Sequence, residues 1–524
     1  MLINSSSHYK RPHYNFPGGG GGGGGAWQLA AGHWIPAKMP MTIVHPRPDS
    51  EITGVARQQY AYADGVFQYR IPISVQGGAW PFHYELILGP AGASIAQADF
   101  NPADPYNSNY GAVIWTPTSE GGPYTFQAKV TDQDGSTATV TWTATALNSQ
   151  FIFIDPAAVT NGTGTKASPF NTMVGLSVAV AGGVASAYYG KMFTYRAGTT
   201  TFTGAETNGN LHLKSNYNAY IFLGYTGETC TLNFSASAII NDDQSDLYIG
   251  QIGITNARTD GVNIGGQINT AFIFSTQVTA ENRVTLFEMP ASNAAYSTNT
   301  PHDSNEGVIV FDNPGTIRNY FSYTYSTLTN CSVPYYDIYM VKYGVHEGCQ
   351  TVGNPALFPY GGFFVKSDAQ YFTIRNNYSV HGSGYGVIVI YGQSQTVTNN
   401  NIEVGYNTII NLSADLNDGA LMGFNNGSIG LNTTPNLYIF RNTLVGGYGA
   451  YGDYAWNLIE DKNIVIDDYG MSAKYNISNP VNGCTVTETN TLAGSSSTGI
   501  LDVNYKLTGT YRTSYLGTRG AEIG

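Results

Sequence analysis

The sequence is poor in charged residues, in cysteine and in long apolar runs. Only 11% of its 524 residues are charged and the formal net charge is −12, so the basic stripe that a nucleic-acid backbone requires is not expected. No stretch has the length of a membrane span, and therefore no membrane insertion is predicted. The four cysteines, Cys230, Cys331, Cys349 and Cys484, lack metal-ligand spacing. We interpret them as buried thiols, and we expect no cofactor or metal.

The N-terminus also lacks the charged start and the apolar run of a secretory signal. Yet 42% hydrophobic residues, 63 glycines and 39 tyrosines, with little charge, are typical of an all-β extracellular protein with many tight turns. A virion protein would combine these features, because it assembles inside the cell and acts outside after lysis. A removed signal or a signal-independent secretion route would also combine them.

Composition and pattern divide the chain into four segments. Residues 1–40 contain an unbroken glycine run, Gly18 to Gly25, which predicts a flexible attachment arm or a plain disordered tail. Residues 41–148 predict a β-sandwich, because two runs with period-two alternation, 124–130 and 137–142, flank a turn at 132–135. Residues 149–505 predict a stack of short strands, and residues 506–524 a closing segment.

Short strands in the long third segment end repeatedly in a polar residue. The markers are Asn376, Asn399, Asn442, Asp467 and Asn490, which stand 23, 43, 25 and 23 positions apart. A step of 23 fits one coil of a β-solenoid, and 43 fits two coils. Asparagine tolerates the left-handed conformation of a corner, and its amide can bond to the asparagine of the next coil.

Two parts of the chain resemble known families. The strand 151–156, the turn 161–165 and the short apolar run 173–180, which predicts a helix covering the first coil, resemble the start of right-handed parallel β-helices of the pectate-lyase-like superfamily. The hairpin at 124–142 resembles immunoglobulin-like (cadherin-like) domains of bacterial and phage surface proteins. We therefore expect an all-β chain in which an immunoglobulin-like β-sandwich precedes a right-handed parallel β-helix, as in bacteriophage tailspike and tail-fibre proteins.

The resemblance to tailspikes implies several further properties. It implies a parallel homotrimer on the virion that acts outside the cell. Its partners would be bacterial surface polysaccharide and, through the N-terminal arm, other virion proteins.

The best candidate for polysaccharide chemistry is the stretch 342–348, which contains a cation, a histidine and a carboxylate. Glycoside hydrolysis uses two carboxylates, whereas a lyase needs a base and a cation beside a uronate. We take Lys342, His346 and Glu347 as candidate catalytic residues. Glu306 would lie about two coils before them, and Asp368 and His381 one and two coils after. The alternative is a surface turn with ordinary solvated charges.

Tyrosines crowd the same region and suit contact with sugars, because their rings are apolar and their hydroxyls stay hydrated. The candidate carbohydrate-binding residues are Tyr335, Tyr336, Tyr339 and Tyr343. The alternative is that tyrosine is simply a good strand residue.

Three hypotheses about function stay open at this point. The first is a phage tailspike that binds a bacterial surface polysaccharide and depolymerises it. The second is a non-catalytic receptor-binding or capsid-decorating fibre of the same fold. The third is a bacterial extracellular polysaccharide lyase or glycoside hydrolase.

Overall fold

The structure is a computed structural model. It describes residues 34–52, 54–98, 110–172, 188, 190–201, 211–213, 220–233, 239–241, 246–255, 272–274, 283–292, 309–311, 318–331, 336–339, 341–353, 363–366, 369–381, 388–391, 400–411, 422–425, 436–445, 450–452, 457–461, 464–466, 475–477, 485–489 and 492–494. Most of the predicted arm, the predicted helix at 173–180 and the predicted closing segment lie outside these residues.

The N-terminal unit is built from nine strands and contains the three helical elements that the described residues form, all short 3₁₀ helices. The strands are β1 (Thr42–His45), β2 (Tyr60–Ala61), β3 (Tyr69–Pro72), β4 (Ser74–Gln76), β5 (His83–Leu88), β6 (Ser94–Ala98), β7 (Tyr110–Trp115), β8 (Gly121–Thr131) and β9 (Thr137–Ala146). The 3₁₀ helices are η1 (Asp49–Glu51), η2 (Arg57–Gln59) and η4 (Asn148–Gln150). Within the described part of the chain, no helix has the length and apolar character needed to cross a bilayer.

Two sheets pack face to face in this unit and form a β-sandwich. One sheet has the order β2-β9-β8-β5 and the other β3-β7-β6, while β1 and β4 form a separate pair. β2 runs parallel to β9, and the other neighbours are antiparallel. The predicted hairpin is confirmed: β8 and β9 pair from Tyr124 opposite Ala144 to Thr131 opposite Thr137. Its alternation buries Phe126 and Trp142, whose rings stack at 5.4 Å.

The rest of the described chain forms a parallel β-solenoid of three sheets. β10 pairs with β11, and from β11 on each strand pairs with the third strand after it. The first sheet contains β10 (Phe151–Ile154), β11 (Met192–Tyr195), β14 (Tyr220–Gly224), β17 (Asp246–Gly250), β20 (Arg283–Phe287), β23 (Arg318–Thr324), β26 (Val341–Glu347), β29 (Gln370–Arg375), β32 (Asn400–Gly405), β35 (Asn436–Phe440), β38 (Asn457–Asp461) and β41 (Thr485–Thr489).

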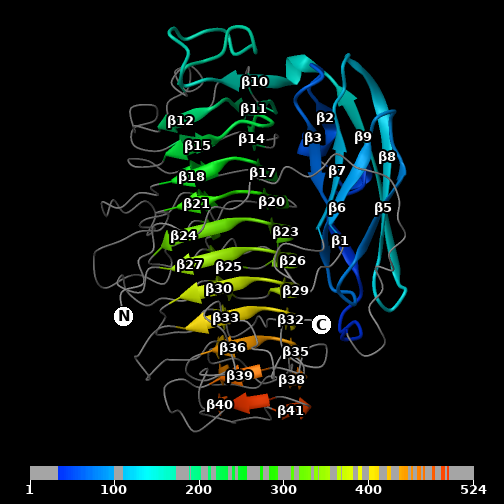
Figure 1. Ribbon diagram of the computed structural model, residues 1–524, viewed down its shortest axis with the longest axis vertical. Coiled ribbons are helices and arrows are strands. Elements are labelled where there is room, and N and C mark those ends of the chain that lie inside the picture. Colours follow the sequence, from blue (N-terminus) through cyan, green and yellow to red (C-terminus); the bar gives the residue numbers. More distant parts are fainter. Residues whose placement is uncertain are drawn as a thin grey trace.

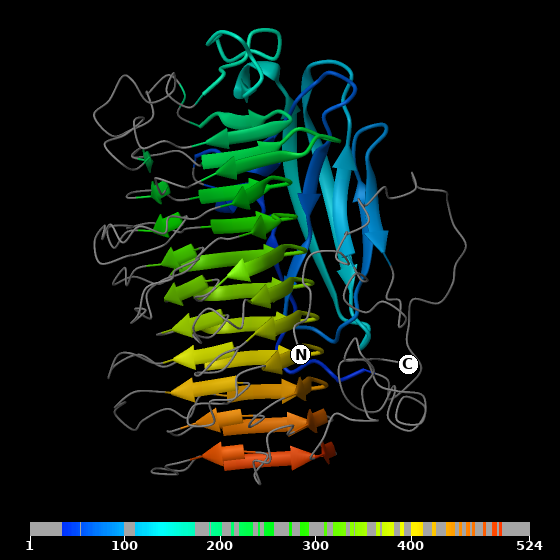
Figure 2. The same ribbon diagram turned by 60° about the vertical axis from the view of Figure 1, so that its left-hand side comes forward.

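The second sheet contains β12 (Gly198–Thr201), β15 (Cys230–Asn233), β18 (Gly253–Thr255), β21 (Ala291–Ser292), β24 (Thr327–Cys331), β27 (Gln350–Gly353), β30 (Tyr378–His381), β33 (Thr408–Asn411), β36 (Thr443–Val445), β39 (Ile464–Ile466) and β42 (Leu492–Gly494). The third contains β13 (Leu211–Leu213), β16 (Ile239–Asn241), β19 (Phe272–Phe274), β22 (Ile309–Phe311), β25 (Tyr336–Tyr339), β28 (Phe363–Lys366), β31 (Ile388–Tyr391), β34 (Met422–Asn425), β37 (Ala450–Gly452) and β40 (Tyr475–Ile477). Figure 2 shows the coils stacked along the long axis of the molecule.

A short turn with a fixed conformation joins the first sheet to the second in successive coils. Its first residue has a positive φ and its second is buried. The first residues are Gln251, Glu288, Tyr325, Gly348, Asn376, Tyr406 and Arg441, and the second residues are Ile252, Met289, Ser326, Cys349, Asn377, Asn407 and Asn442. The left-handed residue turns the chain, and the buried residue extends the core around the corner.

Three of the buried turn residues form an asparagine ladder. Asn407 Oδ1 accepts from the backbone amide of Asn377, and Asn442 Oδ1 accepts from that of Asn407, both at 3.0 Å. Each Nδ2 group also donates to a carbonyl of the preceding coil, for example Asn407 to Ile374 (3.0 Å). A left-handed corner residue and amide bonds between coils were both predicted, and both are present. They belong to two neighbouring residues: Asn376 adopts the left-handed conformation (φ 55°), and Asn377 makes the ladder bonds.

Replacing Asn407 with alanine is expected to lower the free energy of unfolding by about 3 kcal/mol, because buried amide groups of both neighbouring coils lose their partners. Equilibrium denaturation in urea measures this. The control is Asn161→Ala, which removes one exposed hydrogen bond to the Asn171 amide and should cost less than about 1 kcal/mol. Equal losses for the two variants would show that the ladder does not stabilise the corner.

The predicted coil period is wrong. Ser322 pairs with Val345, 23 positions on, but Glu403 pairs with Tyr438, 35 positions on. The interval of 43 between Asn399 and Asn442 therefore contains one step between coils and not two. The turn from the first sheet to the second has two residues in most coils, three after β20 and five after β14, whereas the other connections vary more in length. The spacing of markers elsewhere in the coil therefore changes with the length of these connections.

The sandwich lies beside the solenoid and covers its first sheet, with its strands running along the long axis (Figures 1 and 2). β1 and β4 contact β23, β26 and β29. Alternation in the first sheet places every second side chain outside the solenoid, yet eight consecutive members of one outward row are at most 4% exposed. These members are Met192, Ile221, Tyr248, Thr285, Ser322, Val345, Thr373 and Glu403. The outer face of the first sheet is therefore a second, internal core of the molecule.

Candidate functional site

His346 lies on β26 with its side chain inside the solenoid. It occupies the same register row as Tyr323 and Ile374, which are core residues. Its ring centroid is 4.3 Å from that of Phe363 and 5.1 Å from that of Tyr323. It is fully buried, and burial lowers its pKa to about 3. His346 is therefore a neutral core residue at physiological pH.

Glu347 faces outward from the same strand, but the sandwich covers it. Arg375, its register neighbour in the next coil, donates from Nη2 to Glu347 Oε2 (2.9 Å), and both side chains are at most 2% exposed. Trp80 of the sandwich donates from Nε1 to Glu347 Oε1 (3.2 Å). Burial raises the pKa of Glu347, and the attraction of Arg375 opposes this shift. This ion pair lies wholly within the contact between sandwich and solenoid.

Arg375 also binds the backbone of the sandwich at the turn after β4. It donates to the carbonyl oxygens of Gly77 (2.9 Å) and Val75, and its guanidinium lies 4.5 Å from the ring centroid of Phe82. The amide of Gly77 donates to Thr373 Oγ1 (3.1 Å). Gly77 has φ +67°, and a Cβ there would come within 2.4 Å of the Pro40 carbonyl oxygen. Only glycine fits this docking point without strain.

Glu403 is a second carboxylate in the same contact, one coil beyond Thr373 and 1% exposed. The cation that lowers the pKa of Glu403 most is Arg375. The Nη groups of Arg375 already bind Glu347 and two carbonyl oxygens. Burial raises the pKa of Glu403 to about 7, although Arg375 and Lys38 act in the opposite direction. The contact thus holds two carboxyl groups near one guanidinium.

These positions bear on the predicted catalytic cluster. A carboxylate or histidine that cleaves a polymer must reach the scissile bond. His346 faces the core and Glu347 lies beneath the sandwich, so a polysaccharide outside the molecule cannot contact either residue. Lys342, on the same strand, is half-buried and therefore partly open to solvent.

The other predicted site residues are distributed over different sheets. Tyr343 is on β26 in the first sheet, whereas Tyr336 and Tyr339 are on β25 in the third. His381 is the last residue of β30, in the second sheet. β30 pairs with β27, the strand that follows Glu347 in the same coil. His381 therefore lies one coil after Glu347, and the predicted distance of two coils is wrong. Glu306, Asp368 and Tyr335 lie outside the described residues.

A ladder of three tyrosines runs along the start of the first-sheet strands. The ring centroids of Tyr320 and Tyr343, and of Tyr343 and Tyr371, are 5.5 Å apart, with interplanar angles of 16° and 21°. All three are half-buried. Because the rings stack on one another, their faces are occupied and their edges and hydroxyls are left for other contacts. Tyr343 lies between the other two rings, so a sugar cannot stack on either face of its ring.

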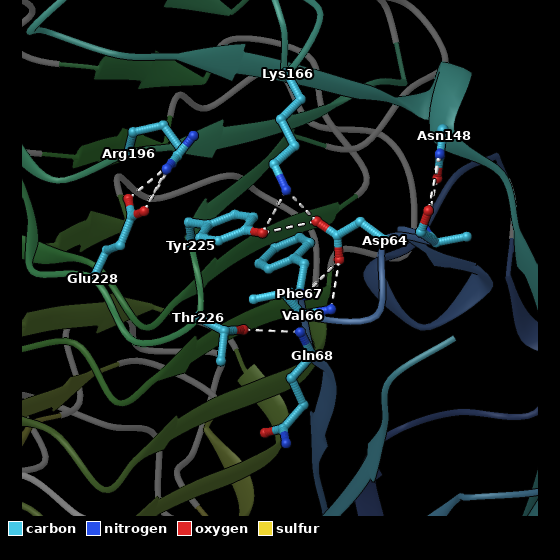
Figure 3. Close-up of polar contacts among 11 residues, drawn as sticks. Asp64, Val66, Phe67, Gln68, Asn148, Lys166, Arg196, Tyr225, Thr226 and Glu228 are labelled. Carbon is cyan, nitrogen blue, oxygen red and sulfur yellow. Dashed lines mark hydrogen bonds and ion pairs between the residues drawn. The ribbon is translucent and has the colours of Figure 1, made fainter. Parts of the chain in front are cut away.

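A polar network joins the sandwich to the first coils of the solenoid (Figure 3). Asp64 Oδ2 accepts from Lys166 Nζ (2.6 Å) and the Tyr225 hydroxyl (2.7 Å), and Oδ1 accepts from the amides of Val66 and Phe67. Burial alone would raise the pKa of Asp64, but these hydrogen bonds lower it. The carboxylate has a full set of partners, so we assign the network to docking.

No protein-family model matches the chain, and no curated protein or solved structure is significantly similar to it. The functional argument therefore depends on the chain's own residues.

Sequence reasoning missed both the buried contact and the tyrosine ladder. Tyr320, Tyr343 and Tyr371 stand 23 and 28 positions apart, within the range of coil steps, so aligning the strands would have found the ladder. Arg375 and Glu403 carry no comparable signal, because only the position of the sandwich makes them internal.

Proposed function

We propose that the chain is a bacteriophage tail-fibre or tailspike protein that binds bacterial surface polysaccharide. The observation that carries this proposal is the distribution of connections in the solenoid. Residues 256–271, 293–308 and 412–421 separate second-sheet strands from third-sheet strands, and residues 426–435 separate a third-sheet strand from a first-sheet strand, whereas shorter turns join the first sheet to the second. The long connections therefore flank the third sheet. In repeat proteins, insertions gathered on one face often form the binding face. The strand with Tyr336 and Tyr339, β25, belongs to the third sheet.

The finer fold assignment is part of the same proposal. The orders β2-β9-β8-β5 and β3-β7-β6 support an immunoglobulin-like sandwich, which also divides seven strands between two Greek-key sheets. Parallel strands joined by crossovers within one sheet are right-handed in about 98% of cases, which supports a right-handed β-helix. We further propose a homotrimer on the virion, with the N-terminal arm as the attachment to other virion proteins.

Binding without cleavage is the activity that the described residues support. Of the catalytic candidates, His346 and Glu347 are buried, and a hydrolase needs two accessible carboxyl groups. The proposal therefore assigns Glu347 to docking and makes polysaccharide recognition the function of the solenoid.

Incubating the purified chain with capsular and lipopolysaccharide preparations from candidate hosts tests this function. Bound polymer, new reducing ends and the ultraviolet absorbance of unsaturated uronates are measured together. We expect binding with neither cleavage signal. Reducing ends with ultraviolet absorbance would indicate a lyase, and reducing ends alone would indicate a hydrolase. Either result would overturn the non-catalytic assignment.

A further inference from the structure

We propose that Lys342, Tyr343 and Tyr371 form a binding site for a carboxylate-bearing saccharide at the seam between sandwich and solenoid. This inference rests on the proposed function and names the class of sugar. Its geometric basis is the tyrosine ladder, in which register-equivalent strands hold the rings parallel at a spacing of 5.5 Å. A site on paired strands presents its polar groups in fixed positions, which lowers the entropy lost on binding.

The site has hydrogen-bonding groups that the described part of the chain does not use. Among the described residues, no hydrogen-bond or ion-pair partner is present for the hydroxyls of Tyr343 and Tyr371 or for the ammonium group of Lys342. Lys342 Nζ lies 5.4 Å from the ring centroid of Tyr343, and all three residues are half-buried. Two hydroxyls and one cation thus lie together on neighbouring coils, open to a ligand.

The opposite end of the ladder is closed by the sandwich. The Arg47 guanidinium covers the outer face of Tyr320 at 4.3 Å and pairs with Glu51. The Tyr320 hydroxyl lies 3.2 Å from Glu51 Oε2, and burial raises its pKa to about 12, so the phenol stays protonated and donates. Arg47 and Glu51 neutralise each other, and together they occupy this end of the ladder. The accessible end is therefore the other one, with Tyr371 next to Tyr343 and Lys342.

The backbone at that end is held in an uncommon conformation. Tyr371 has φ +53°, in the left-handed region that non-glycine residues rarely adopt. The stack with Tyr343 keeps its ring in line with the ladder despite this cost. Asn401, at the corresponding position of the next coil, has φ +54°, so this conformation repeats at the start of successive strands and fixes the position of Tyr371 in the coil.

A carboxylate is the sugar group that fits this set of donors best. A charge-assisted bond from an ammonium group is roughly twice as strong as a neutral hydrogen bond, and phenol hydroxyls can bind the neighbouring sugar hydroxyls. Because the net charge of the chain is −12, long-range attraction does not bring a polyanion to the surface. Recognition of the acid must therefore come from short-range contact with Lys342.

The test compares binding of hexuronate-containing host oligosaccharides with binding of the same oligosaccharides after reduction of the carboxyl group. Calorimetry on the full chain should show at least a roughly tenfold loss of affinity on carboxyl reduction, and a similar loss for Lys342→Gln with the unreduced ligand. Tyr343→Phe and Tyr371→Phe should each weaken binding about fivefold. They keep the stacked rings, so the thermal midpoint should not change.

Matched controls are Lys191→Gln and Tyr188→Phe, which lie near the first coils and should bind like the unmodified chain. If the chain binds host oligosaccharides and the Lys342, Tyr343 and Tyr371 variants bind equally well, the site is wrong while the proposed function stands. Equal affinity for the carboxyl-reduced ligand would overturn the acidic class. If the unmodified chain binds no host saccharide, the proposed function itself fails.

Discussion

Replacing Arg375 with methionine is expected to lower the free energy of unfolding by about 3–5 kcal/mol. The substitution keeps much of the side-chain volume but leaves Glu347 buried without its cation and frees the carbonyls of Val75 and Gly77. Urea denaturation at pH 8 measures the loss. The loss should be smaller at pH 5, because burial raises the pKa of Glu347 and its carboxyl can then bind a proton.

The matched control is Arg47→Met, which breaks a more exposed ion pair with Glu51. That pair is an i,i+4 contact in which Glu51 keeps 35% of its side chain exposed. Its loss should cost less than about 1 kcal/mol. The double variant Arg375→Met with Glu347→Gln should recover part of the stability, since the uncompensated charge is gone. If Arg375→Met cost no more than the control, the buried contact would not hold the sandwich to the solenoid.

Replacing Glu403 with glutamine is expected to stabilise the chain at pH 8 by about 3 kcal/mol and to have little effect at pH 4. Burial raises the pKa of Glu403 from an ordinary value of 4.5 to about 7. The folded chain therefore retains a proton that the unfolded chain has lost between these pH values. Stability falls as the pH rises through this window, and the whole cost is present above pH 7. Glutamine does not titrate, so the variant does not lose this stability.

The measurement is the difference in unfolding free energy between Glu403→Gln and the unmodified chain across this pH range. Burial lowers the pKa of His45 and His346 to about 3, so both proteins lose stability in acid as the unfolded chain protonates these residues below about pH 6.5. The difference removes this shared effect. Glu85→Gln, at a partly exposed ion pair with Lys129, should give a difference below about 1 kcal/mol at every pH. A pH-independent difference for Glu403→Gln would contradict the account.

Local pattern was sufficient to predict the hairpin of the sandwich and the stacked parallel strands. The hairpin from Tyr124 to Trp142 followed from alternation and a turn, and both are local properties. The asparagine ladder followed from the conformational range of asparagine, but its members were assigned one residue early at Asn376. The coil length could not be read from the sequence, because the connections to and from the third sheet vary widely in length, while the turn between the first two sheets varies less.

The candidate site was harder to predict, because its accessibility depends on how the two units pack. A lysine, a histidine and a carboxylate within 342–348 give the same sequence pattern whether the strand is exposed or covered by another unit. Alternation explains why His346 faces the core when Glu347 does not. That Glu347 is also buried depends on Trp80 and Arg375, distant in sequence. Lys342, Tyr343 and Tyr371 stay half-buried because they lie at the start of their strands, whereas the sandwich covers Tyr320.

The central claim is that this chain recognises a bacterial surface polysaccharide. Its most direct test is the adsorption of the fluorescently labelled full chain to a host strain and to an isogenic strain that lacks the polysaccharide. The account predicts saturable binding to the first strain, competition by the purified polysaccharide and no binding to the second. Equal binding to both strains would show that the chain recognises something other than polysaccharide.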